Sequence, residues 1–235
     1  MRCKNAISAE EEIGRMFTGI IEAVGRIAEL QSVREGMRIR IESVALGLSD
    51  VQLGDSIAVN GVCLTVTQFS SRDFYADISA ESLRYTRFAS MRVGDSVNLE
   101  KALTLSKPLG GHLVSGHVDG IGSIVAVSSE GDSLRYTIEC EQELTRYIAN
   151  KGSVCVDGVS LTVTGLVEKG FTLNIVPHTT ANTIIPGYKS GTKVHLEVDL
   201  MARYAERLLQ VGQLAESKEK PALDEAFLAR NGYKV

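Results

Sequence analysis

The strongest constraint in the sequence is an eight-residue pattern that occurs twice. "NGVCLTVT" at residues 60–67 returns 97 residues later as "DGVSLTVT" at residues 157–164. The same offset aligns residues 16–103 with residues 113–200 without a gap, and 23 of the 88 aligned pairs are identical. Because each copy is long enough to bury its own core, the pattern indicates a tandem duplication of one domain rather than a solenoid.

Both copies have the pattern of β structure. Apolar and polar residues alternate along residues 37–42 and again along residues 134–139, which is the period of half-buried strands. Asn-Gly at residues 60–61 and Asp-Gly at residues 157–158 favour tight hairpins, because both dipeptides tolerate positive φ. We therefore predict an all-β chain in which each copy closes into a small barrel of about six strands.

Helices are expected inside each barrel and after residue 200. The helix of the second copy should cover residues 141–152 and end at Gly152. Beyond the barrels, apolar residues fall on one helical stripe: Met201, Tyr204, Ala205, Leu208 and Leu209. Such a helix would either pack on its own barrel or be shared between subunits, and the stripe is compatible with both. Residues 223–233 have the pattern of a further short helix.

The repeat also sets the expected domain boundaries. They are an N-terminal extension over residues 1–15, an N-terminal barrel over 16–112, a C-terminal barrel over 113–200, and a C-terminal helix and tail over 201–235. The extension lacks the apolar centre of a secretory signal; we expect it to be disordered and assign it no function.

Composition excludes several classes of partner. The net charge is −4 and no basic stretch occurs, so neither nucleic acid nor an anionic membrane surface is expected. No apolar run approaches the roughly 20 residues of a membrane-spanning helix. The four cysteines form no zinc or disulfide pattern, and His112 and His117 would face opposite ways on a strand, which argues against a shared metal ion. The sequence therefore predicts a cytoplasmic protein with reduced thiols and no metal.

The repeated motif places a polar row on one side of a strand. In an extended strand alternate side chains face opposite sides, so the aliphatic residues would face the core and the others would face outward. The outward residues are Cys63, Thr65 and Thr67 in the first copy and Ser160, Thr162 and Thr164 in the second. Two interpretations stay open: the row binds a polar ligand, or threonine merely favours exposed strand positions.

The two copies differ at polar positions. The unlike pairs are Ile20 and His117, Cys63 and Ser160, Glu81 and His178, and Gly54 and Lys151. A structural role is the default expectation for each histidine, but His117 stands where the first copy has an isoleucine. A general base in one half only would make the two halves chemically unequal. Two similar sites with unlike polar groups would suit two similar ligands with different roles.

Four motifs in order resemble the α-chain type of riboflavin synthase: "MFTGIIEAVG" from residue 16, "NGVCLTVT", "GGHLVSGHVDG" and "DGVSLTVT". The similarity covers about residues 16–210, and residues 1–15 depart from the family, whose chains usually begin at the first motif. The resemblance implies two tandem homologous six-stranded Greek-key barrels followed by a C-terminal α-helix, assembled as a homotrimer. Each active site would lie between the N-terminal barrel of one subunit and the C-terminal barrel of the next.

The resemblance also implies a reaction and its residues. Two molecules of 6,7-dimethyl-8-ribityllumazine per site would exchange a four-carbon unit, giving riboflavin and 5-amino-6-ribitylamino-2,4-pyrimidinedione without any cofactor. We expect His117, as a base or proton relay, to act with Ser160 and Thr162 of its own copy, and Cys63 to be a nucleophile or a packing residue. The full set expected to bind substrate is Phe17, Gly19, Ile20, Ile21, Cys63, Leu64, Thr65, Asp77, Ile78, Ser79, Ala80, Glu81, Ser82, Gly116, His117, Val118, Lys151, Ser160, Leu161, Thr162, Asn174, Ile175, Val176, Pro177, His178 and Thr179. Association with lumazine synthase is a further expectation.

A non-catalytic binding module is the main alternative. The same fold serves as a lumazine or flavin antenna, but those relatives tend to lose polar residues of the motif, which this chain keeps at Cys63, His117, Ser160 and Thr162. A barrel of the flavin-reductase type would need a nucleotide domain, and no G-x-G-x-x-G follows a predicted strand. The sequence therefore favours the enzyme.

Overall fold

The computed structural model describes residues 16–34, 36–219 and 232. It divides into one compact unit that ends at Leu200 and a second that begins at Met201, and each is described by itself. The predicted extension over residues 1–15, and all but one residue of the helix predicted over 223–233, lie outside the described residues.

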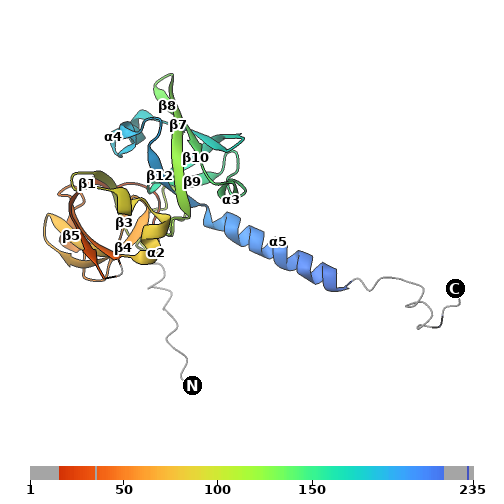
Figure 1. Cartoon of the computed structure of the whole chain (residues 1–235), viewed down its shortest axis with the longest axis horizontal. Helices are drawn as coiled ribbons and strands as arrows, with labels where there is room; N and C mark the ends of the chain where they lie inside the picture. The colour runs from red at the N-terminus through yellow and green to blue at the C-terminus, as the bar shows by residue number, and fades with distance from the viewer. Residues whose placement is uncertain (1–15, 35, 220–231, 233–235) are drawn as a thin grey trace. The chain divides into compact units, whose positions relative to one another are not determined.

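Twelve strands of the described chain form two closed antiparallel barrels (Figure 1). The first consists of β1 (Ala23–Val33), β2 (Gly36–Glu42), β3 (Ser56–Val59), β4 (Val62–Phe69), β5 (Asp73–Ser79) and β6 (Ser96–Lys101), in the order β1-β2-β5-β4-β3-β6. The second consists of β7 (Gly120–Glu130), β8 (Ser133–Glu139), β9 (Ser153–Val156), β10 (Val159–Val167), β11 (Gly170–Ile175) and β12 (Lys193–Val198), in the order β10-β11-β8-β7-β12-β9. The predicted pair of six-stranded barrels is confirmed.

Short helical segments connect the strands. They are η1 (Leu48–Asp50), α2 (Ala80–Tyr85), η2 (Phe88–Ser90), α3 (Gln142–Thr145), α4 (Pro177–Ala181) and η3 (Ile185–Gly187). The helix α5 (Leu200–Glu219) follows the second barrel. No described helix is both long and apolar enough to cross a membrane.

The duplication extends to irregular details of the strands. The register of β1 and β2 shifts between Ile27 and Glu29, and the register of β7 and β8 shifts at the equivalent place, between Ile124 and Ala126. A second bulge in β4 likewise recurs in β10. Because a bulge bends its strand at a defined position, the two barrels share their curvature as well as their strand order.

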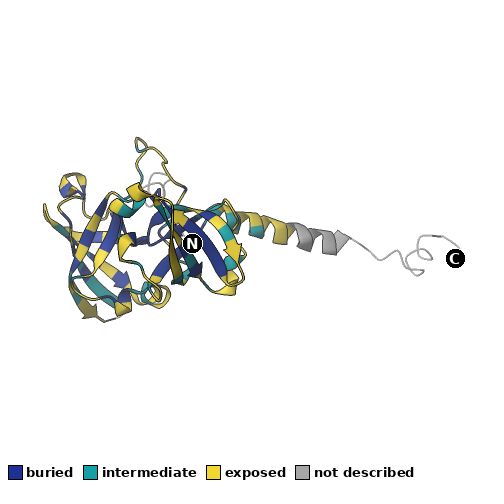
Figure 2. Ribbon diagram, turned by 90° about the horizontal axis from the view of Figure 1, so that it is seen from above, coloured by how far each residue is buried: buried dark blue, intermediate teal, exposed yellow. Residues whose placement is uncertain are grey.

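Side chains follow the predicted alternation in the repeated motif. On β4, Val62, Leu64 and Val66 are buried, whereas Thr65 and Thr67 are exposed. The same pattern of buried strand interiors and exposed outer positions holds over both barrels (Figure 2). The outward polar row predicted from the sequence is therefore present.

The predicted helix over residues 141–152 is wrong beyond its first turn. Only α3 is α-helical, and the chain then continues in tight turns in which Tyr147 N–H donates to Leu144 O (3.1 Å) and Ile148 N–H to Thr145 O (3.1 Å). Leu144 and Ile148 are buried as the helical stripe predicts, but Lys151 N–H donates to Val163 O (2.8 Å) and Gly152 O accepts from Val163 N–H (2.9 Å), so pairing with β10 takes the backbone out of the helix. The residue that turns the chain is Lys151, with φ of 65°, rather than Gly152.

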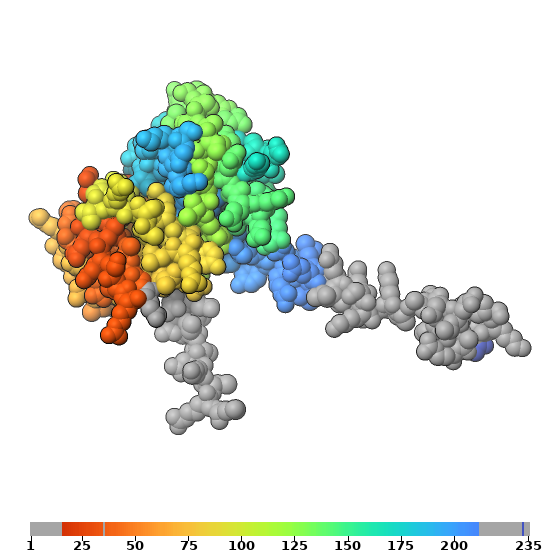
Figure 3. All heavy atoms as spheres, viewed as in Figure 1, coloured from red at the N-terminus to blue at the C-terminus, as the bar shows by residue number. Residues whose placement is uncertain are grey.

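The barrels meet at their hairpin tips. Asn60 Oδ1 accepts from Asn98 N–H (2.7 Å), and one copy later Asp157 Oδ1 accepts from His195 N–H (2.8 Å). Asn98 Nδ2 then donates to Asp157 O (2.8 Å) and His195 Nδ1 to Asn60 O (2.9 Å), so each copy holds the tip of the other. His195 Nε2 accepts from Arg87 N–H (2.8 Å), which makes the ring neutral, and burial lowers the pKa of His195. These bonds tie the two halves together, and the two halves lie against each other in the space-filling view (Figure 3).

The helix α5 confirms the prediction of a C-terminal helix. In the described part of this helix, the large apolar side chains of the stripe are exposed: Met201, Tyr204, Leu208 and Leu209. Both interpretations of this helix, packing on its own barrel or being shared between subunits, remain predictions.

Candidate functional site

Two short segments run between the barrels ahead of β1 and β7. We call residues 17–21 the N-terminal strap and residues 114–118 the linker strap. Phe17 N–H donates to Val114 O (2.8 Å) and Val114 N–H donates to Phe17 O (3.0 Å), so the straps pair antiparallel. Phe17 and Val114 are fully buried and pack together with Ala58.

Each strap then lies on the barrel of the other copy. Ser160 N–H on β10 donates to Gly19 O (2.7 Å), and Cys63 N–H on β4 donates to Gly116 O (2.9 Å). Ile21 accordingly packs on the core of the second barrel, and Val118 on the core of the first. The straps are exchanged between the two copies.

Glycine is required where the straps cross the motif strands. Gly116 has φ of +78°, and a Cβ there would lie 2.6 Å from the Cβ of Cys63. Gly19 has φ of +74°, and its Cβ would lie 2.6 Å from the Cβ of Ser160. Only a residue without a side chain allows this conformation and this approach.

A buried carboxylate holds each strap to its own barrel. Glu100 on β6 accepts from the N–H and the hydroxyl of Thr18 (2.8 and 2.7 Å) and from Gly19 N–H (2.9 Å). The same three bonds recur one copy later at Glu197 on β12, with lengths of 2.6, 2.8 and 3.0 Å. Each strap is thus fixed from both sides: by a carboxylate of its own barrel and by the motif strand of the other.

The exchange changes which predicted residues lie together. The sequence groups His117 with Ser160 and Thr162 of its own copy, but the structure places its strap on β4, where the preceding residue contacts Cys63. The N-terminal strap instead brings Ile20 to the strand of Ser160. We call the outer side of β4 with the linker strap the first face, and the outer side of β10 with the N-terminal strap the second face. Local patterns cannot reveal this crossover, although the glycines at residues 19 and 116 are a signal of it.

The second face contains a histidine–serine pair that the sequence did not suggest. His112 Nδ1 lies 2.6 Å from Ser160 Oγ, and His112 is only 9% exposed. Its Nε2 is buried and has no hydrogen-bond partner in the described part of the chain. Burial lowers the pKa of His112, partly offset by the charge of Asp199. A neutral imidazole at this place can accept the Ser160 proton or orient the hydroxyl.

The remaining predicted residues divide by exposure. Exposed are Ile20, Thr65, Asp77, Ser79, Ala80, Glu81, His117, Lys151, Thr162, Asn174, Val176, Pro177 and His178; partly buried are Ile21, Cys63, Ser82, Val118, Ser160, Leu161 and Thr179; buried are Phe17, Gly19, Leu64, Ile78, Gly116 and Ile175. The buried side chains lie in the cores or under the straps, so these residues can offer a ligand at most their backbone.

Asp77 at the end of β5 is already paired. Its two carboxylate oxygens accept from Arg38 Nε (2.7 Å) and from a terminal guanidinium nitrogen of Arg38 (3.0 Å). The hydrogen bonds from Arg38 lower the pKa of Asp77. Arg38 and Asp77 therefore neutralise each other's charge beside the first face.

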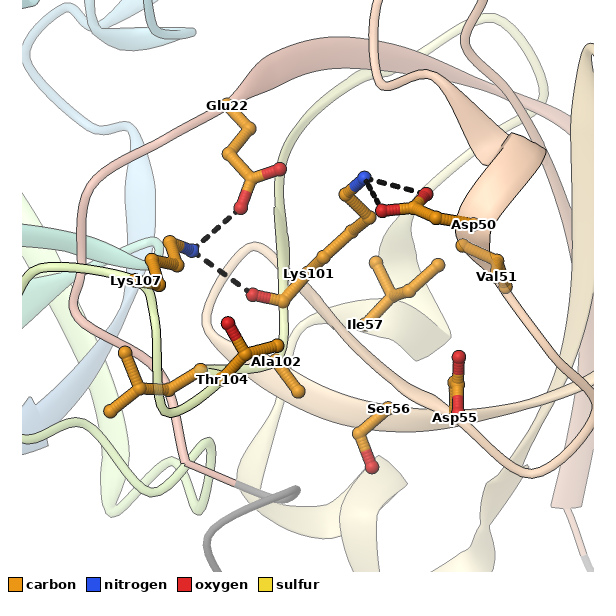
Figure 4. A pocket seen from close by; sticks show the side chains of 11 residues that line it. Glu22, Asp50, Val51, Asp55, Ser56, Ile57, Lys101, Ala102, Thr104 and Lys107 are labelled. Atoms are coloured by element: carbon orange, nitrogen blue, oxygen red, sulfur yellow. Dashed lines mark hydrogen bonds and ion pairs between the residues drawn. The ribbon is translucent and has the colours of Figure 1, made fainter.

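A cavity of about 450 Å³ lies beside the first barrel (Figure 4). Its two cations are neutralised, since Lys101 Nζ lies 2.8 Å from Asp50 and Lys107 Nζ lies 2.6 Å from Glu22. None of the residues predicted to bind a ligand line it. No group of metal-ligating side chains occurs among the described residues. We therefore locate the candidate site at the two faces rather than in this cavity.

Comparison with known proteins identifies the family. A sequence profile for the lumazine binding domain matches residues 18–102 and again residues 115–199. A riboflavin synthase of Photobacterium phosphoreum is 44% identical over 218 residues, covering 93% of this chain and 99% of the relative. The chain belongs to the riboflavin synthase family. A riboflavin synthase of Bacillus subtilis is 40% identical over 93% of this chain and 100% of its own length.

Solved structures of the same fold include binding proteins. LumP complexed with riboflavin is similar with a TM-score of 0.72 and 25% identity, covering 77% of this chain and 98% of that chain. LumP complexed with flavin mononucleotide has a TM-score of 0.69 at the same identity and coverage. The double-barrel fold of the riboflavin synthase family is therefore shared with proteins whose structures hold a flavin.

Proposed function

We propose that this chain catalyses the riboflavin synthase reaction. Two molecules of 6,7-dimethyl-8-ribityllumazine give riboflavin and 5-amino-6-ribitylamino-2,4-pyrimidinedione, as one transfers a four-carbon unit to the other. The observation that carries this proposal is the near-full-length similarity to riboflavin synthases, at 44% and 40% identity. The enzyme is accordingly a transferase, and the two substrates serve as donor and acceptor without a further cofactor.

The two faces suit a reaction between two like molecules. In this proposal each face binds one lumazine, and the exposed hydroxyls of Thr65 and Thr162 contact the ribityl chains. Holding both reactants makes their reaction effectively unimolecular, which removes much of its entropic barrier.

Proton transfer is assigned to the face where an exposed imidazole lies. His117 on the first face accepts a proton from the acidic 7-methyl group of one lumazine. Cys63 contacts the same substrate, as a nucleophile or by packing. On the second face Ser160, oriented by His112 (2.6 Å), polarises the other pteridine or directs an attacking hydroxyl.

Assembly belongs to the same proposal. We infer a homotrimer in which the first face of one subunit meets the second face of the next, with residues 16–112 and 113–200 as the two barrel domains. The exposed apolar stripe of α5 supports this, because such a stripe needs a partner surface. We also propose that the enzyme works in the cytoplasm and associates with lumazine synthase.

A lumazine- or flavin-binding protein without turnover is the second candidate. The structures of LumP with riboflavin and flavin mononucleotide favour it, since they have the same fold. The strongest observation against this second candidate is the higher identity to riboflavin synthases over nearly the whole chain.

One incubation separates the candidates. The purified chain is mixed with 6,7-dimethyl-8-ribityllumazine alone, and the absorption spectrum is followed. The proposal expects one riboflavin for every two lumazines consumed, by the stoichiometry of the reaction. Tight binding without riboflavin would assign the chain to the antenna proteins, and no binding would contradict both candidates.

A further inference from the structure

The two strap carboxylates make the same bonds in different surroundings. Glu100 is 1% exposed and has a cation beside it, because Lys107 Nζ lies 3.1 Å from its Oε1. Glu197 is 5% exposed, and no described cation pairs with it. Burial raises the pKa of Glu197 to about 7, against the hydrogen bonds from Ser115, which lower it. An uncompensated buried carboxylate is costly, which makes its retention on β12 informative.

Glu197 is linked to His117 through two residues. Its Oε1 accepts from the N–H and hydroxyl of Ser115 (2.6 and 2.8 Å), and its Oε2 accepts from Gly116 N–H (3.0 Å). The same Ser115 hydroxyl oxygen accepts from His117 N–H (3.3 Å). The backbone on the N-terminal side of His117 is therefore fixed by this one carboxylate, while Gly116 O is held by Cys63.

We propose that Glu197 is a positioning residue, whose carboxylate fixes Ser115 and Gly116 and so sets the place of His117 on the first face. The inference rests on the proposed function, in which His117 is the proton acceptor. Glu100 does the same for Ile20 on the second face, whose strap carries no imidazole. The two carboxylates make equivalent bonds, but only Glu197 fixes the strap that carries the proposed proton acceptor.

Glu197 positions His117 in its ionised form. A carboxylate accepts all three donors, whereas a protonated oxygen becomes a donor and competes with one of them. The other ionisable groups that face it are Asp119, whose charge raises its pKa, and Cys155 on β9, whose own pKa burial raises. The charge of Glu100 also raises the pKa of Cys155. Positioning therefore strengthens as the pH rises through about 7.

The matched pair of variants Glu197→Gln and Glu100→Gln tests this. An amide cannot accept from all three donors, so each variant loosens one strap. We expect Glu197→Gln to lower kcat by about 10- to 100-fold with KM little changed, since misplacing a reacting group acts mainly on the chemical step. Glu100→Gln should mainly raise KM, because its strap carries only a contact residue. Equal effects of both variants on kcat would overturn the inference.

A double-mutant cycle separates positioning from general structural damage. If Glu197 acts through His117, then kcat of His117→Ala/Glu197→Gln should equal that of His117→Ala alone. Glu100→Gln, in contrast, should raise KM by the same factor in the His117→Ala background as in wild type. Independent losses of kcat from the first pair would contradict the proposal. If Glu197→Gln does not fold, Ser115→Ala replaces it, since it removes only the hydroxyl link.

An NMR titration provides a readout that does not depend on turnover. In the His117→Ala variant the Gly116 amide resonance should titrate with a midpoint near pH 7, the pKa of Glu197, and Glu197→Gln in the same background should abolish this. A titration that persists without Glu197 would refute the assignment. If wild type forms no riboflavin, the proposed function fails; if wild type is active and the cycle is additive, only the positioning role fails.

Discussion

The first and second faces share a backbone but differ in chemistry. On the first face Cys63 holds the linker strap, which carries the exposed His117. On the second face Ser160 holds the N-terminal strap, which carries Ile20, and its hydroxyl is bonded to the buried His112. The difference teaches that an exchange of straps lets one duplicated scaffold present two different sets of polar groups.

Removing the exposed imidazole should have the largest effect. His117→Ala is expected to lower kcat by about 100- to 1000-fold, because a general base is lost. Ile20→Ala, the matched change on the second face, should alter KM by only a few-fold. Steady-state kinetics of riboflavin formation measure both; similar losses of kcat would show that the faces are chemically alike.

Adding a side chain under a strap should have the next largest effect, a loss of stability. Gly116→Ala introduces a Cβ 2.6 Å from the Cβ of Cys63 at a φ of +78°, and should lower the free energy of unfolding by about 3 kcal/mol. Gly131→Ala is the control, since its φ of +61° is similar but no atom lies within 4 Å; it should cost only about 1 kcal/mol. Urea unfolding distinguishes the two, and equal costs would mean that the strap does not press on β4.

The serine of the second face should matter more than a threonine outside the strap contact. Ser160→Ala removes the bond to His112 and should lower kcat/KM by about 10-fold. Thr67→Ala loses only an exposed bond of 3.2 Å to Tyr75 O and should change kcat/KM by less than about 2-fold. Equal losses would remove Ser160 from the reaction.

The smallest expected effect concerns the hairpin tips. Because burial lowers the pKa of His195, its contribution to stability is present above its unfolded pKa of about 6.5 and is lost as the pH falls through the folded value. His195→Asn copies the residue of the first half, Asn98, and should remove about 1 kcal/mol of this pH dependence. Urea unfolding at pH 8 and pH 5 tests it; an unchanged slope would mean that His195 does not titrate on unfolding.

Much of the fold follows from the sequence alone. The period of two along residues 37–42, the hairpin dipeptides and the 97-residue offset together predict two like barrels, and all three rest on local backbone and burial rules. The helix predicted over residues 141–152 ended early because Lys151 and Gly152 pair with Val163 on β10, a long-range contact that a local helical pattern does not contain.

Less of the site follows from the sequence. The outward row of Thr65 and Thr162 is predictable, because side-chain alternation needs no tertiary information. The partners of Ser160 and Cys63 are not, because they come from straps that cross between barrels. Besides the glycines at residues 19 and 116, a second signal was available. Glu100 and Glu197 are identical acidic residues at equivalent positions of two buried strands, and a buried carboxylate needs donors.

Mixed oligomers test most directly whether His117 and Ser160 serve different faces. His117→Ala and Ser160→Ala chains are co-expressed with different tags, and mixed oligomers are assayed for riboflavin formation beside each variant alone. In a random trimer about a quarter of the sites would join an intact first face to an intact second face from the other chain. The mixed oligomers should therefore be more active than either variant assayed alone. Activity no higher than the average of the two variants would contradict it, since both changes would then lie on the same face.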